Sequence, residues 1–123
     1  MTYREALEIV RRHFESLFPK TCSTCGRRFV SLREYIRSTR RVGQAISYDA
    51  ELGDWQTQQP MGSLAFSNCP CGSTLVLSTD GMPLPQRQAL LAWVREETER
   101  QHITPSDLLE RLRSDLRTQV VDG

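Results

Sequence analysis

The sequence predicts an α+β fold, a single domain over residues 1–123 in which an antiparallel sheet of about four strands is flanked by an N-terminal helix and two C-terminal helices. Apolar residues recur at three- and four-residue steps near both ends of the chain, which is the period of an amphipathic helix. In the middle of the chain they alternate with polar residues, which is the period of a half-buried strand. Four cysteines in two close pairs predict that a metal organises this domain.

Residues 2–17 are predicted to form the N-terminal helix. Thr2 can accept a hydrogen bond from the first helical amides, and Glu5 stands three residues later, as in a capping box. Pro19 ends the helix. One face carries its apolar residues, which are Tyr3, Ala6, Leu7, Val10, Phe14 and Leu17.

A second, shorter helix is predicted over residues 31–39, where Ser31 and Glu34 repeat the capping pattern. The alternation over residues 46–52 then predicts a strand, and Gly53-Asp54 predicts a two-residue turn into a partner strand over 55–59.

A second hairpin is predicted around residues 63–79, on either side of the segment Cys69-Pro70-Cys71-Gly72. The alternation of its apolar residues predicts that Leu64 and Phe66 face Leu75 and Leu77 across the hairpin.

The two C-terminal helices are predicted over residues 86–101 and from Thr104 onwards. Prolines precede the first of these helices. In the second, Thr104 is a typical N-cap, Pro105 suits the first helical position, and Asp107 favours the helix N-terminus. Its apolar stripe consists of Leu109, Leu112, Leu116 and Val120.

The cysteines form the pairs Cys22/Cys25 and Cys69/Cys71, with 43 residues between the pairs and no cysteine left over. Two such pairs are typical of one tetrahedral four-thiolate metal site, and a disulfide within so close a pair would be strained. The segments CGRRFV and CGSTLV share one pattern, in which Gly26 and Gly72 permit the positive φ that closes a metal-binding turn.

These two turns and the hairpin around residues 63–79 resemble the zinc ribbon family, in which two cysteine knuckles bind one Zn²⁺. The resemblance implies one structural zinc per chain, with Cys22, Cys25, Cys69 and Cys71 as its four ligands. The second knuckle departs from the family pattern, because its spacer is the single residue Pro70, which has no amide hydrogen to donate to sulfur. Iron remains an alternative metal.

Enzymatic functions are disfavoured by the residues themselves. A four-thiolate site has no open position for hydrolytic chemistry, and the two histidines, His13 and His102, have no partner motif. Thiol redox chemistry remains an alternative, although the strand-to-helix setting of a low-pKa cysteine is missing.

Nucleic-acid binding is the main alternative function. Four arginines, Arg33, Arg37, Arg40 and Arg41, would share one face of a helix long enough to hold them, and Tyr48 and Trp55 could stack on bases. Residues 1–45 carry ten basic against four acidic side chains, whereas residues 46–123 carry six against eleven. The acidic half would repel phosphates.

The sequence therefore predicts a non-enzymatic zinc-binding adaptor or regulatory module whose partner is another protein, bound through the same arginines or the last helix. Its composition, with 38% hydrophobic and 25% charged residues, is that of a globular protein. No apolar run is long enough for a secretory signal or a membrane span, so we expect a cytoplasmic protein without a membrane partner.

Overall fold

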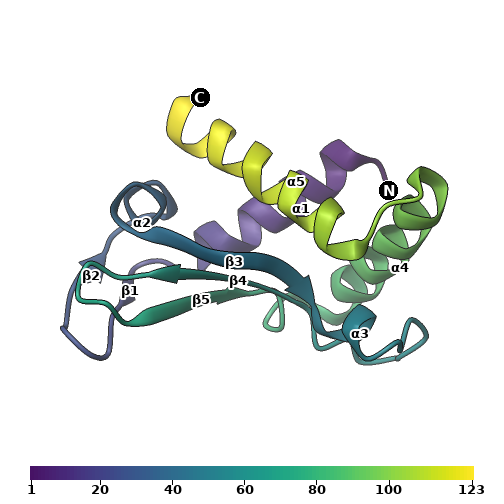
Figure 1. Cartoon of the computed structure of the whole chain (residues 1–123), viewed down its shortest axis with the longest axis horizontal. Coiled ribbons are helices and arrows are strands. Elements are labelled where there is room, and N and C mark those ends of the chain that lie inside the picture. Colours follow the sequence, from purple (N-terminus) through teal and green to yellow (C-terminus); the bar gives the residue numbers. More distant parts are fainter.

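The computed structural model describes all residues from 1 to 123, and it confirms the α+β class (Figure 1). Helices α1, α4 and α5 lie on one side of a three-stranded antiparallel sheet of order β3-β4-β5, and a two-stranded sheet, β1-β2, lies near one end. The elements are α1 (Tyr3–Ser16), β1 (Lys20–Thr21), β2 (Arg28–Phe29), α2 (Leu32–Ser38), β3 (Arg40–Ser47), α3 (Tyr48–Glu51), β4 (Ser63–Asn68), β5 (Thr74–Ser78), α4 (Leu84–Gln101), α5 (Pro105–Arg117) and the π-helical turn η1 (Thr118–Asp122).

The predicted N-caps are present at three helices. The hydroxyl of Thr2 accepts a hydrogen bond from the amide of Glu5 at 3.1 Å, and Ser31 does the same for the amide of Glu34 at 3.1 Å. At α5 the capping box is complete, because Thr104 and Asp107 each accept from the other's backbone amide. These caps satisfy amides that have no partner within the helix, which is why short polar side chains mark the helix starts in the sequence.

The prediction of a strand over residues 46–52 and a partner strand over 55–59 is wrong. The chain leaves β3 at Ser47, whose hydroxyl accepts a hydrogen bond from the amide of Ala50 and starts the single turn α3. The buried carboxylate of Asp49 then accepts from the amides of Met61 at 3.0 Å and Gly62 at 3.1 Å. These bonds from side chain to backbone close residues 49–62 into a loop, so the local alternation does not form a strand.

The hairpin of β4 and β5 is confirmed, but its predicted facing pairs are wrong. Phe66 lies opposite Val76, and Leu77 lies opposite Ala65. The tight turn sets this register, because the amide of Cys69 donates to the carbonyl of Ser73 at 2.8 Å. Since side chains alternate along a strand, Phe66 and Leu77 lie on opposite faces of the sheet.

The two faces of the sheet have different environments. The inner face, with Leu77 and Ala45, packs beneath α1 and α5 as part of a cluster of 19 buried residues that also includes residues of α2 and α4. The outer face, with Val42 and Phe66, contributes no residue to that cluster. No helix of the structure combines the length and the apolar character needed to cross a membrane.

Candidate metal centre

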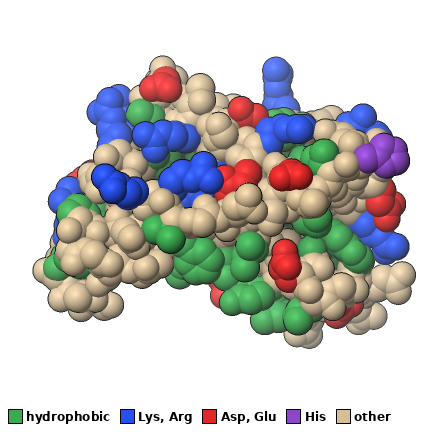
Figure 2. Space-filling view, viewed as in Figure 1, with side chains coloured by type: hydrophobic (Ala, Val, Ile, Leu, Met, Phe, Trp, Pro, Cys, Tyr) green, Lys and Arg blue, Asp and Glu red, His purple; other side chains and the backbone are tan.

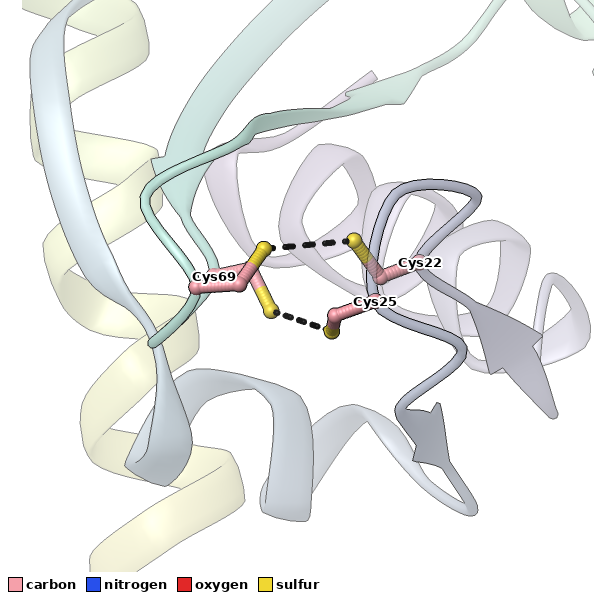
Figure 3. A group of neighbouring side chains, drawn as sticks. Cys22, Cys25 and Cys69 are labelled. Carbon is pink, nitrogen blue, oxygen red and sulfur yellow. Dashed lines mark hydrogen bonds between the residues drawn. The ribbon is translucent and has the colours of Figure 1, made fainter.

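Two loops bring the four cysteines together (Figure 3). Cys22 and Cys25 lie between β1 and β2, and Cys69 and Cys71 lie in the turn between β4 and β5. All four Sγ atoms lie within 4.8 Å of one another, with 3.8 Å between those of Cys22 and Cys71 and 3.7 Å between those of Cys25 and Cys69. All four cysteines are free thiols.

The sulfur positions fit a tetrahedral metal ion. A Zn–S bond of about 2.3 Å places the corners of a regular tetrahedron about 3.8 Å apart, which matches the two contacts between the loops. Four sulfur ligands suit zinc or iron and exclude hard cations such as Mg²⁺ and Ca²⁺. The four cysteines can therefore hold one metal ion.

The first knuckle has the backbone geometry that its sequence predicts. Gly26 has φ +78°, and its amide donates to the carbonyl of Cys22 at 2.8 Å. The backbone amides of Cys25 and Thr24 point at the sulfur of Cys22 and lower its pKa. Amides directed at sulfur stabilise a thiolate and orient it as a ligand.

The second knuckle compensates for the missing amide of Pro70. The amide of Cys71 takes its place and donates to the sulfur of Cys69, although burial and the neighbouring sulfurs together raise the pKa of Cys69 to about 11. The hydroxyl and the amide of Ser73 lower the pKa of Cys71 to about 6. Gly72 closes the turn at φ +97°, so the shorter spacer still presents both sulfurs to the first loop.

The site is partly enclosed by the core. Cys22 and Cys69 are 1% and 2% exposed and belong to the hydrophobic cluster, whereas Cys25 and Cys71 are exposed. A metal bound here would join the segment after α1 to the β4–β5 hairpin, so its effect on the fold would be structural.

The four arginines do not share one helical face. Arg33 and Arg37 lie on α2, which ends at Ser38, and Arg40 and Arg41 lie on β3. Neighbouring residues of a strand point to opposite faces, and Arg41 is on the inner face, where it pairs with Glu110 of α5. All four remain exposed.

The sequence also contains two histidines and two aromatic residues considered as functional candidates, and each lies within a helix, between helices or against the core. His13 of α1 makes a 3.0 Å hydrogen bond with the carbonyl of Ser78, and His102 lies between the last two helices with φ +55°. Tyr48 is 40% exposed at the start of α3, whereas Trp55 packs against the core.

No family model, curated protein or solved structure matches the chain.

Proposed function

We propose that the chain is a non-enzymatic, zinc-stabilised adaptor or regulatory module that binds another protein. Cys22, Cys25, Cys69 and Cys71 hold one structural Zn²⁺ in this proposal. Four thiolates occupy every position of a tetrahedral ion, so no position is left for a substrate or an activated water. The metal fixes the β4–β5 hairpin, and the hairpin supplies the binding surface.

The observation that carries the proposal is the apolar outer face of the sheet. Val42, Phe66 and Val76 form one row across the three strands, and Ile46 and Leu64 form the next. None of the five belongs to the core cluster, and Val42 and Val76 are 37% and 39% exposed. Figure 2 shows hydrophobic side chains gathered along the lower middle of the molecule.

An apolar outer face is unusual for an antiparallel sheet. Such sheets commonly place polar side chains on the face that no helix covers. Contiguous apolar patches on a protein surface are typical of interaction sites. We therefore assign this outer face, defined by Val42, Ile46, Leu64, Phe66 and Val76, to partner binding.

The edge of the sheet beside this face indicates what kind of segment would bind. The amide of Thr79 donates to the carbonyl of Ser63, and the amide of Cys69 donates to the carbonyl of Ser73. Because backbone hydrogen bonds alternate along an antiparallel pair, the odd-numbered residues of β5 make their backbone hydrogen bonds with β4. The even-numbered residues direct their backbone N–H and C=O groups away from β4. Thr74 and Val76 thus offer backbone groups to a further strand. Strand β5 carries no charge and no proline, two features that usually prevent edge pairing.

The proposed partner segment is therefore extended, with alternating apolar residues, and it adds to β5 as a fourth strand. Its apolar side chains would extend the outer face.

Selection of displayed peptides on the zinc-loaded protein tests this proposal. We expect selected peptides to alternate apolar residues and to lose binding to the Val76→Lys variant, which places a charge on the outer face. Val30→Lys is the matched control, because Val30 is 62% exposed and lies outside the three-stranded sheet. Selected peptides without alternating apolar residues, or equal peptide binding to the two variants, would contradict the proposal. Sedimentation of the protein alone would show whether a second copy of the chain occupies the outer face in place of another protein.

Nucleic-acid binding is the alternative function, and it can be tested with the same protein sample. Arg33, Arg37 and Arg40 can be reversed to Glu together, whereas Arg41 must stay because Glu110 pairs with it. We expect the wild-type chain to bind oligonucleotides no more tightly than about 10⁻⁶ M, the upper end of non-specific affinity at physiological salt. Tighter, salt-sensitive binding that the triple reversal abolishes would replace the proposed function with a nucleic-acid-binding one.

A further inference from the structure

A cavity of about 150 Å³ lies between the inner face of the sheet and helices α1, α2 and α5. Thirteen of its 21 lining residues are hydrophobic, among them Phe14 of α1, Leu77 of β5 and Leu112 of α5. An apolar cavity of this size accommodates a benzene-sized molecule. The cavity lies on the inner side of the sheet, and of the five outer-face residues only Leu64 is among those that line it.

The charged residues around this cavity are all basic. Arg41, Arg113 and Arg117 line it, and no aspartate or glutamate does. The side chain of Arg113 is only 16% exposed, and the carboxylate nearest to it is that of Glu110, at 3.6 Å. Burial lowers the pKa of Arg113, as expected for a guanidinium whose charge is incompletely compensated.

The carboxylate of Glu110 is shared among several donors. It also pairs with Arg41 and accepts a hydrogen bond from the amide of Ala45. Arg117 has no carboxylate partner in the structure. Glu110 thus pairs with two of the three arginines that line the cavity and Arg117 has no carboxylate partner, and this excess of positive charge favours an anion in or at the cavity.

A buried hydroxyl without a partner lies in the same cavity wall. Tyr35 of α2 is 2% exposed, and its phenolic oxygen has no hydrogen-bond partner. Burial raises the pKa of Tyr35. The nearby hydroxyl of Ser67, which lies close to the phenol but makes no hydrogen bond of acceptable geometry with it, and the charge of Arg113 both lower that pKa, so these groups are close to one another. Buried polar groups without partners are rare, and a bound acceptor would satisfy this one.

From these observations we infer that the cavity binds a small carboxylic acid whose apolar part is about the size of a benzene ring. The carboxylate pairs with Arg113 and accepts from the hydroxyl of Tyr35, and the ring or branched chain contacts Phe14, Leu77 and Leu112. Guanidinium groups bind carboxylates with strong, directional hydrogen bonds.

The cavity has a route to solvent. Among its lining residues, Arg41, Ser114 and Arg117 are exposed, so it opens between β3 and α5. Figure 2 shows basic side chains over this part of the molecule. A positive opening would attract an anionic ligand over a neutral one.

Titration of the full-length, zinc-loaded chain with benzoate tests the inference, with benzyl alcohol as the neutral probe of the same shape. Methyl NMR signals of Leu77 and Leu112 should shift saturably with benzoate. Arg113→Gln should weaken benzoate binding about tenfold to a hundredfold, the value of a hydrogen bond to a charged group, and leave benzyl alcohol binding unchanged. Arg37→Gln is the matched control, because Arg37 is exposed and does not line the cavity.

A second variant covers the case in which Arg113→Gln fails to fold, since Arg113 also donates to the carbonyl of Phe66. Tyr35→Phe removes only the unpartnered hydroxyl, so it should weaken benzoate binding about threefold to tenfold without lowering the melting temperature. The inference is refuted if benzoate causes no saturable shift at the lining methyl groups, if benzoate and benzyl alcohol bind equally well, or if Arg37→Gln weakens benzoate binding as much as the cavity variants do.

Discussion

Replacing one exposed cysteine of the metal centre, by Cys25→Ser or Cys71→Ser, should remove the metal and lower the free energy of unfolding by at least about 4 kcal/mol. Both side chains are exposed, so the substitution removes no core packing, unlike a change at Cys22 or Cys69. The effect therefore isolates the link that the metal makes between the two knuckles.

The magnitude follows from the length of chain that the metal closes. Between Cys25 and Cys69 there are 43 residues, and fixing the ends of a loop of that length removes about 4 kcal/mol of conformational entropy from the unfolded state. Domains are typically stable by only about 5–15 kcal/mol. For a chain of this size we expect a fall in melting temperature of roughly 10–20 °C.

Thermal unfolding with and without a metal chelator provides the assay. The chelator should lower the melting temperature of the wild-type chain to that of the variants and leave the variants unchanged. Ser23→Ala, in the same exposed loop, is the control and should behave as wild type. Amide exchange should show that the β4–β5 turn loses protection while α4 and α5 retain theirs. A variant that melts within about 2 °C of wild type, or that responds equally to the chelator, would refute the reasoning.

Three further predictions concern the metal, the pH dependence and the loop after β3. The purified protein should contain one zinc per chain by elemental analysis, and iron in its place would change the metal but not the site. Burial and donation to Asp115 raise the pKa of Tyr3, so the stability that Tyr3 contributes should be fully present below about pH 10 and be lost as the pH rises further. Tyr3→Phe should reduce that dependence on alkaline pH in denaturant titrations and cost about 1.5 kcal/mol at pH 7. Gly62→Ala should destabilise the fold by roughly 2–4 kcal/mol, because φ is +100° and the added Cβ would lie 2.6 Å from the hydroxyl of Thr79. Gly43→Ala is the control and should cost about 1 kcal/mol, because φ is +62° but the space around it is open. Equal losses of unfolding free energy in the two variants would exclude the steric explanation.

The sequence by itself predicts the features that depend on neighbouring residues. The caps at Thr2, Ser31 and Thr104 need only a short polar side chain and an amide three residues later, and the structure confirms each. The positive φ of Gly26 and Gly72 is equally local, because it follows from a turn that directs amides at sulfur. The cysteine pairs also predicted that both turns would meet, since a four-thiolate site requires it.

Only the tertiary structure determined the features that depend on residues distant in the sequence. The buried carboxylate of Asp49 accepts from Met61 and Gly62, and this contact overrides an alternating pattern typical of a strand. The register of the β4–β5 hairpin placed Phe66 on the outer face, and helix packing paired Arg41 with Glu110. No local pattern encodes these contacts, because each one depends on which surfaces meet when the helices cover one face of the sheet and leave the other uncovered.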